Sequence, residues 1–471
     1  MVTHQELLDL RVAQNTGGSI IETTLVAVVV GALCCLLTTT KTNSAWIPRL
    51  AVEVLIVWCG SCCIFNSTGI TTMGLLAAGL IGWLYWGSRS KISSSATSTG
   101  GYAETTIDKN KTMKAEWSGV FTLCRGGLMF LTVLSILAAD FNFFPKRFLK
   151  TEEFGISLMD TGVGSFALIA GTGASRAASM LHTWTPKGRS QCRKFVFPAI
   201  PLIAIGMIRV WVLSTSDLKQ HVTEYGRHWN FFFTLAAAPQ LYFAAVIVLG
   251  KVRNTLTGGA LERDVVSGKR ATVGVPPAVL SLLLLSIHEA LLYGLGWNQL
   301  ILSPYRDDMF TANKEGTCTI IAYAAIFALG VDVGTVVRQA TSGRSLRNTM
   351  SALTAVGAVM FWLTSQVETP SRRLANAPFV FHTLFFNCLV SLVVCTFQSN
   401  YRPSKIINAL STNEMLCFVG ANLLTGAVNV SISAIDLSWY AAHSVLLVYI
   451  SFICCTLCVL HHFGIQIRYK R

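Results

Sequence analysis

The chain has 471 residues, of which 52% are apolar and only 13% are charged. Soluble domains carry about 25% charged residues, so this composition excludes an ordinary soluble protein. The net charge of +14 indicates contact with anionic lipid and not with nucleic acid, because the basic residues form no single face with interleaved aromatic residues.

Apolar runs of about twenty residues recur along the chain, and each is long enough to cross a hydrocarbon core of about 30 Å. The predicted fold class is therefore all-α: a polytopic integral membrane protein of about 13 transmembrane helices in one domain, 1-471. The first run follows a segment without a basic n-region, so we expect a retained span and not a cleaved signal peptide. The expected spans lie near 20–40, 50–65, 70–87, 118–139, 157–182, 194–214, 228–250, 275–297, 316–337, 349–366, 378–397, 412–433 and 438–463.

The basic residues predict an orientation. Most of the 37 Lys and Arg residues lie in alternate connections, which the positive-inside rule places in the cytosol. An odd number of spans then puts the N-terminus on the far side and the C-terminus in the cytosol. The connections expected in the cytosol are 41–49, 88–117, 183–193, 251–274, 338–348 and 398–411, with the tail 464–471.

The far-side connections mix acidic, basic, amide and aromatic residues, as in "AADFNFFPKRFLK" after the fourth span. Asp140 ends that span and Lys150 lies ten residues further on, while Arg125 lies near the other end of the same apolar run. A carboxylate that is partly out of water and close to a cation is suited to act as a general base near pH 7. An ordinary interfacial ion pair is the alternative interpretation.

The next span begins with "SLMDTGVGSFALIAGTGASR", whose small residues recur at three- and four-residue spacings. This pattern predicts close helix packing. Packing does not explain Asp160, although an aspartate is favoured at the start of a helix.

The connection "HVTEYGRHWN" contains two histidines and a glutamate. His221 or His228 is suited to act as a base or as a donor to an oxyanion, and Glu224 to orient either one. An interfacial loop with an aromatic belt is the alternative.

Two further polar blocks, "TANKEG" and "SRRLAN", flank later spans. Arg372 and Arg373 present donor forks that suit phosphate, although basic pairs also anchor helices. The residues of these blocks that suit a hydroxyl-rich ligand are Asn313, Lys314, Glu315 and Asn376.

Several polar residues inside the spans need a partner or a wet cavity. They are Glu53, His288, Glu289, Asp332, Asn422 and Asn429. The last two lie seven residues apart and therefore on one face of a helix.

Metal chemistry is not expected, because all but Cys192 of the 14 cysteines lie in apolar runs and no Cys/His ligand spacing occurs in a polar segment. The sequence also contains no nucleophile elbow, P-loop or HExxH motif.

Several blocks of this chain closely resemble the glycosylphosphatidylinositol inositol-acyltransferase family of the PIG-W type. The matching blocks are "NTGGSIIE", "RGGLMFLTVLSILAADFNFFPKRF", "GISLMDTGVGSF", "HVTEYGRHWNFF", "TANKEG", "SRRLANAPF" and "ANLLTGAVN". They occur in order from about residue 15 to residue 436.

The resemblance implies a multispan enzyme of the endoplasmic-reticulum membrane with thirteen spans and a lumenal N-terminus. Such an enzyme moves a long acyl chain, typically palmitoyl, from acyl-CoA to an inositol hydroxyl of glucosaminyl-phosphatidylinositol, with no cofactor besides the acyl-CoA co-substrate. It implies Asp140 as the base and Lys150 as the residue that tunes it or stabilises the thioester oxyanion. The expected substrate-binding residues are Arg125, His221, Glu224, His228, Asn313, Arg372 and Arg373.

Two other functions fit the same residues. In a multispan lipid or solute transporter, intramembrane charges line a path and catalyse nothing. The third possibility is a multispan acyltransferase with a different acceptor. The sequence leaves open the acyl-chain preference, the side from which acyl-CoA enters and the oligomeric state.

Overall fold

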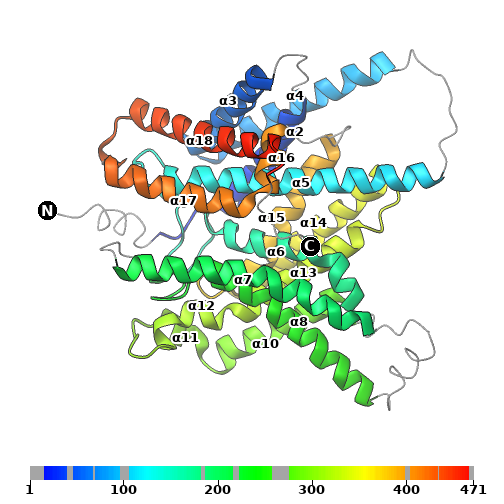
Figure 1. Ribbon diagram of the computed structural model, residues 1–471, viewed down its shortest axis with the longest axis vertical. Helices are drawn as coiled ribbons and strands as arrows, with labels where there is room; N and C mark the ends of the chain where they lie inside the picture. The colour runs from blue at the N-terminus through cyan, green and yellow to red at the C-terminus, as the bar shows by residue number, and fades with distance from the viewer. Residues whose placement is uncertain are drawn as a thin grey trace.

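The structure is a computed structural model, and it describes residues 15–39, 46–66, 69–95, 106–181, 186–215, 222–256, 275–397, 404–432 and 434–465. These residues form a bundle of helices, most of which run along a common direction (Figure 1). They include no β-strand, only two isolated bridges. The helices are α2 (Ile20–Thr39), α3 (Trp46–Phe65), α4 (Ile70–Ser95), α5 (Thr106–Ala138), α6 (Thr161–Leu181), α7 (Pro186–Thr215), α8 (Phe231–Leu256), α10 (Pro277–Glu289), α11 (Trp297–Leu302), α12 (Lys314–Cys318), α13 (Ile320–Val337), α14 (Gly343–Ser365), α15 (Ala377–Phe397), α16 (Lys405–Thr412), α17 (Glu414–Ser431) and α18 (Trp439–His462), with short 3₁₀ or π turns at Lys146–Phe148, Ala290–Gly294, Thr311–Asn313 and Ala434–Asp436.

Within the described residues, 9 helical segments are long and apolar enough to cross a membrane, which confirms the predicted all-α membrane class. The count of thirteen and the orientation stay predictions. Helices nevertheless occupy the other four expected ranges, and in α3 and α4 the apolar stretch is shorter than the helix, at Ala51–Phe65 and Ile70–Leu84. In α6 and α14 the helix is complete, but small and polar residues lower its hydropathy. The nine segments are Ile20–Leu37, Trp117–Ala138, Val196–Thr215, Phe231–Leu256, Pro277–Gly294, Thr311–Val337, Ala377–Phe397, Glu414–Ser431 and Trp439–His462.

The small residues of α6 pack against α13, as their spacing predicts. A Cβ atom on Gly171 would lie 2.1 Å from the carbonyl oxygen of Phe327, and one on Gly330 would lie 2.0 Å from that of Leu168. Only glycine allows the two backbones to approach so closely. This tight pair forms one wall of the bundle's interior.

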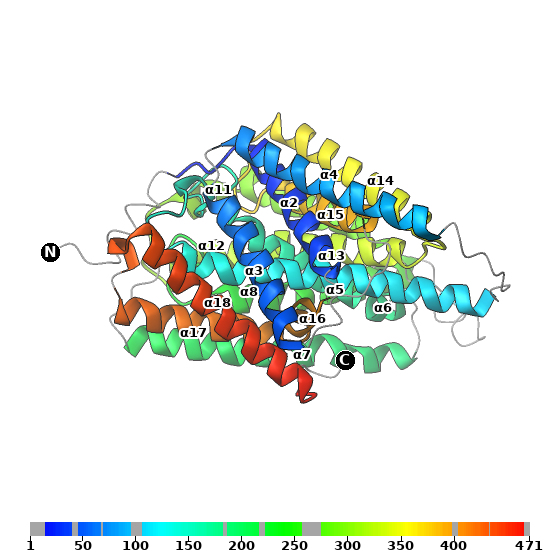
Figure 2. The same cartoon turned by 90° about the horizontal axis from the view of Figure 1, so that it is seen from above.

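The polar connections 139–160, 222–230, 303–319 and 366–376 gather at one end of the bundle, on the left in Figure 1. We call this the polar end. Seen from above, α7 and α17 lie side by side and both reach this end (Figure 2). The polar end is therefore a cap of loops over the ends of several spans.

Each of the polar residues inside the spans has at least one polar contact or lines a cavity, although Nδ1 of His288 and Oδ1 of Asn429 are buried without a hydrogen-bond partner among the described residues. Asn429 donates to Asp140, and the other contacts are backbone hydrogen bonds. These bonds join His288 to the Leu374 carbonyl, Glu289 to the Ala377 amide, Glu53 to the Ile406 amide and Asp332 to the Ala278 backbone, while Asn422 lines a cavity.

Candidate functional site

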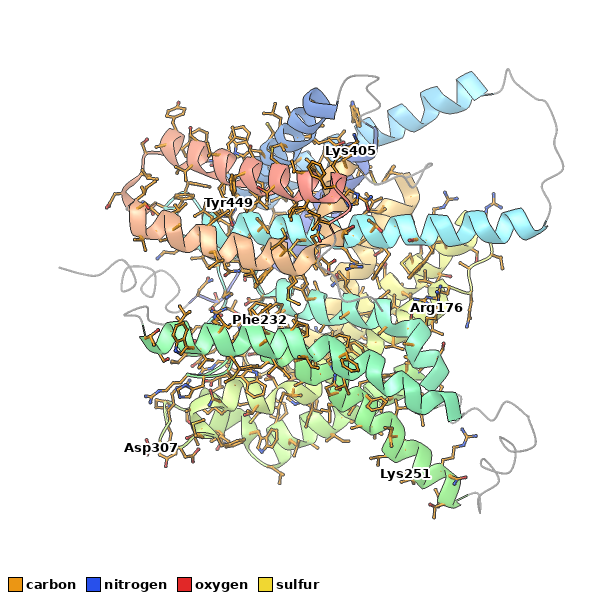
Figure 3. All side chains as sticks on the ribbon, in the orientation of Figure 1. Arg176, Phe232, Lys251, Asp307, Lys405 and Tyr449 are labelled. Carbon is orange, nitrogen blue, oxygen red and sulfur yellow. The ribbon has the colours of Figure 1, made fainter. Side chains whose placement is uncertain are left out.

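A cavity of about 290 Å³ lies at the polar end, between α5, α6, α7 and α17 and beneath segment 222–230. We call it the Asp140 cavity. Its charged lining residues are Asp140, Lys150, Arg209, Glu224 and Arg372, and the rest of the wall is mainly apolar. The two ends of the bundle differ in chemistry: Asp307 lies at the polar end, whereas Arg176 and Lys251 lie at the opposite end (Figure 3).

Asp140 follows directly after the end of α5 and is half-buried. The chain turns there because Phe141 and Phe144 are fully buried and anchor the turn in the core. One carboxylate oxygen, Oδ2, accepts a hydrogen bond from Asn429 Nδ2 at 2.7 Å. This bond holds the carboxylate of Asp140 in a fixed orientation.

Lys150 folds back into the same cavity, as the sequence predicts, but its ion pair is with a different carboxylate. The ammonium Nζ lies 2.6 Å from Glu224 Oε1, a residue 74 positions away. Burial raises the pKa of Glu224, but Lys150 and Arg372 outweigh burial and lower it to about 2. Glu224 is therefore the partner of the lysine, and among the described residues it forms no hydrogen bond or ion pair with a histidine.

The depressed pKa of Glu224 predicts how stability depends on pH. In the unfolded chain this carboxyl titrates near 4.5, so the ion pair contributes fully above that pH and is lost as pH falls toward 2. This shift corresponds to about 3 kcal/mol. We expect Glu224→Gln to lower the melting temperature of the detergent-solubilised protein by a constant amount from neutral pH to about pH 5, and by progressively less at lower pH. An unchanged difference at about pH 3 would contradict the ion pair.

A buried ion pair joins two of the polar connections at the cavity wall, which Arg372 lines. Asp160 precedes α6, is 0% exposed, and accepts hydrogen bonds from the Thr151 amide and hydroxyl and from the Ser157 amide. Its second oxygen lies 2.7 Å from Arg372 Nε. This arrangement explains the aspartate that packing alone leaves unexplained.

A second buried ion pair fixes the other arginine. Glu315 is bound by Arg306 on one side and lies 3.2 Å from Arg373 Nη2 on the other. Lys314 is fully buried and donates to the carbonyls of Ser303 and Tyr305. Arg373 does not line the Asp140 cavity. Its guanidinium instead stabilises the loops that cap the polar end.

The side chain of Asn313 contacts the backbone of segment 222–230. Its Oδ1 accepts from the backbone amides of His228 and Trp229, at 2.8 and 2.9 Å. Two backbone hydrogen bonds reinforce this contact, from Arg227 to Ala312 and from Gly316 to Tyr225. The chains approach so closely that a Cβ atom on Gly226, whose φ is +113°, would lie 2.5 Å from the Asn313 Cα atom.

The other expected binding residues lie apart from the Asp140 cavity or outside the described residues. His228 is exposed and lines an apolar groove of about 840 Å³ between α7 and α8. Arg125 forms an ion pair with Glu414 at 2.5 Å, about 20 Å along α5 from Asp140 at 1.5 Å per residue. His221 lies outside the described residues.

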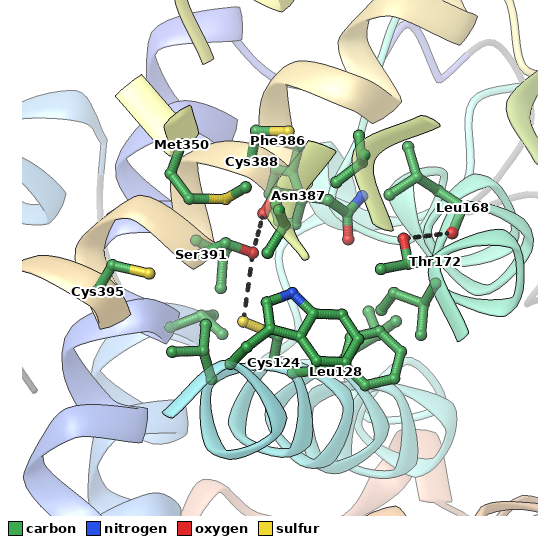
Figure 4. Close-up of a pocket in the computed structure, with 18 of the residues that line it drawn as sticks. Cys124, Leu128, Leu168, Thr172, Met350, Phe386, Asn387, Cys388, Ser391 and Cys395 are labelled. Carbon is green, nitrogen blue, oxygen red and sulfur yellow. Dashed lines mark hydrogen bonds between the residues drawn. The ribbon is translucent and has the colours of Figure 1, made fainter. Parts of the chain in front are cut away.

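An apolar pocket of about 60 Å³ adjoins the Asp140 cavity, since Leu128 and Leu131 of α5 line both. Figure 4 shows its wall, which is mainly aliphatic, aromatic and thiol side chains with the polar side chains of Thr172, Asn387 and Ser391, and in which Cys124 and Ser391 contact each other. Charged groups at Asp140 therefore lie next to an apolar region that extends toward the opposite end of the bundle. This arrangement is suited to a ligand with a polar head and an apolar chain.

Arg209 lines the cavity, although it belongs to no recognisable motif in the sequence. The signal was present, because Arg209 is the only charged residue in the apolar run 196–215. A charge in such a run usually faces the protein interior or a wet cavity. Among the described residues, no group of three or more His, Cys, Asp and Glu side chains is arranged to hold a metal ion.

Comparison with known proteins gives one consistent result. The model of the GWT1 family matches residues 5–460. The chain is 32% identical to GPI-anchored wall transfer protein 1 of Aspergillus fumigatus over 384 residues, which are 74% of this chain and 72% of the relative. It is 29% identical to the Yarrowia lipolytica protein of that name, over 84% of each chain. It is 31% identical to the Saccharomyces cerevisiae protein, over 70% of this chain and 71% of the relative.

Proposed function

The chain belongs to the GWT1 family, which confirms the resemblance drawn from its motifs, and on this basis we propose that it is a glycosylphosphatidylinositol inositol acyltransferase. The proposed reaction moves a long acyl chain, palmitoyl by family analogy, from acyl-CoA to an inositol hydroxyl of glucosaminyl-phosphatidylinositol. The proposed location is the endoplasmic-reticulum membrane. No cofactor beyond acyl-CoA is proposed.

One observation supports the chemistry beyond family membership: a carboxylate and a lysine share a cavity that adjoins an apolar pocket at Leu128 and Leu131. The acyl chain is proposed to lie in the apolar pocket, with the thioester near Asp140. This placement would exclude water from the thioester and leave the inositol hydroxyl as the nucleophile.

The proposed step is direct attack. The inositol O–H gives its proton to the Asp140 carboxylate while its oxygen forms a bond to the thioester carbonyl carbon. The carbon–sulfur bond then breaks, and the CoA thiolate leaves and takes up the proton. Lys150 is proposed to stabilise the negative charge on the carbonyl oxygen, while its partner Glu224 holds it in place.

The purified protein tests this proposal when it is given palmitoyl-CoA and synthetic glucosaminyl-phosphatidylinositol. Mass spectrometry should show the acylated glycolipid, and free CoA should appear in equal amount. Lys150→Ala should lower kcat by about 100-fold, in the range measured for loss of an oxyanion donor.

Lys150→Arg is the matched variant, because it keeps the cation and should retain more activity than the alanine variant. A wild-type protein that moves lipid between leaflets and releases no CoA would refute the acyltransferase proposal and identify a transporter.

A further inference from the structure

Arg209 lies in the candidate membrane span of a helix whose side chains are mostly exposed on the outside of the bundle. It lies in α7, within the span Val196–Thr215, of which only 11% is buried inside the structure. Its neighbours Met207, Ile208 and Trp211 are 58%, 60% and 66% exposed. Arg209 itself is half-buried and lines the Asp140 cavity. A charge at this depth is costly unless it faces a wet cavity and a partner.

The other charged groups of the cavity already have partners. Lys150 is paired with Glu224, Arg372 is paired with Asp160, and Asp140 accepts from Asn429. For Arg209 the described part of the chain supplies no hydrogen bond and no ion pair, although its field reaches Glu224 and lowers the pKa of that carboxyl. A fork of five N–H donors is therefore left facing the cavity.

The position of Arg209 along α7 indicates which part of the cavity its side chain lines. It lies six residues before the end of α7, or about 9 Å along the helix axis, which places it just below the polar end. Across the cavity stands α17, where Asn422 is exposed and Leu423 is 70% exposed. Both views show α7 and α17 next to each other on this side (Figures 1 and 2). The cavity is therefore lined by α7 on one side and by α17 on the other, and each helix carries exposed residues next to one that lines the cavity.

We propose that Arg209 binds the phosphodiester of the membrane glycolipid acceptor, which enters the Asp140 cavity sideways between α7 and α17. This inference rests on the proposed function. A planar guanidinium matches phosphate in charge and geometry. The acceptor's two acyl chains remain in the membrane, so its phosphate arrives at the edge of the cavity nearest the lipid. The inositol ring is bonded directly to that phosphate and would project inward, toward Asp140.

Acyl-CoA also carries phosphates, so the test must separate the two substrates. Arg209→Gln should raise the KM for dioctanoyl glucosaminyl-phosphatidylinositol about tenfold, the loss expected for one charge-assisted contact. The kcat and the KM for palmitoyl-CoA should change by less than about twofold. Arg209→Lys should recover part of the loss, since it keeps the charge without the fork.

A neutral methylphosphonate analogue of the acceptor completes the design. The wild type should bind the analogue about tenfold more weakly than the phosphodiester, whereas Arg209→Gln should bind both equally. Arg176→Gln, which removes an exposed arginine at the opposite end of the bundle, should match the wild type. Binding is measured without acyl-CoA, so it tests the inference independently of catalysis.

Three outcomes would overturn the inference. A raised KM for palmitoyl-CoA alone would assign Arg209 to the donor, and equal loss of kcat with both acceptors would make its role structural. An unchanged acceptor KM would assign it no role in binding. Failure of the proposed function is distinct, because it would appear as an absence of acylated product with the wild type.

Discussion

Replacement of Asp140 by asparagine should lower kcat by about 10²–10⁴-fold, the range that a general base contributes. Asparagine has the same shape and can still accept the hydrogen bond from Asn429, so the fold should be retained. Its amide oxygen cannot take the proton of the inositol hydroxyl at neutral pH. The measurement is single-turnover transfer with saturating palmitoyl-CoA and glycolipid, together with the melting temperature in detergent.

Asp307→Asn is the matched control, because Asp307 is an exposed carboxylate at the same end of the bundle but outside the cavity lining (Figure 3). It should transfer acyl groups at the wild-type rate. Transfer by Asp140→Asn at close to that rate would rule out Asp140 as the base. A melting temperature far below that of the wild type would instead assign Asp140 a structural role.

Replacement of Arg372 by methionine should destabilise the protein by about 3–5 kcal/mol, because it leaves a carboxylate buried without its cation. Asp160 is 0% exposed, and within the described residues the guanidinium of Arg372 is the one cation paired with it. Its remaining donors are a hydroxyl and backbone amides, which do not neutralise the charge. The expected observation is a large fall in the melting temperature in detergent.

The double variant Asp160→Asn, Arg372→Met distinguishes the stability lost through an unpaired charge from the stability lost through poorer packing. Removing both charges should recover part of the loss, because no unpaired ion then remains in the core. If the double variant is as unstable as the sum of the two single variants, the ion pair does not carry the effect. Arg372 would then act through its contact with the Thr151 carbonyl.

Local patterns predicted much of the fold. Small-residue spacing in "GTGAS" predicted close helix packing, which the structure shows to be against α13, and hydropathy placed a helix in every expected range. The seven-residue spacing of Asn422 and Asn429 put both on one face of α17, where one lines the Asp140 cavity and the other contacts Asp140. These features depend on residues close in sequence, so the sequence alone is enough to find them.

The ion pairs could not be predicted in the same way. The partner of Lys150 is 74 residues away and that of Arg372 is 212 residues away, so each pair depends on which loops meet at the polar end. Composition predicted two phosphate-binding arginines in "SRRLAN", whereas the structure places both in buried ion pairs. Arg209, which belongs to no motif, lines the Asp140 cavity as a guanidinium for which the described residues supply no such partner.

The close backbone contact at Gly226 determines where random mutagenesis should find inactivating substitutions. Segment 222–230 carries Glu224 and Tyr225 into the cavity, and block 311–316 holds that segment by backbone atoms and one asparagine. Substitutions that inactivate the protein should therefore also occur in block 311–316, which acts on the cavity only through segment 222–230. In a genetic screen, these positions would be taken for reacting residues, although they only hold that segment in place.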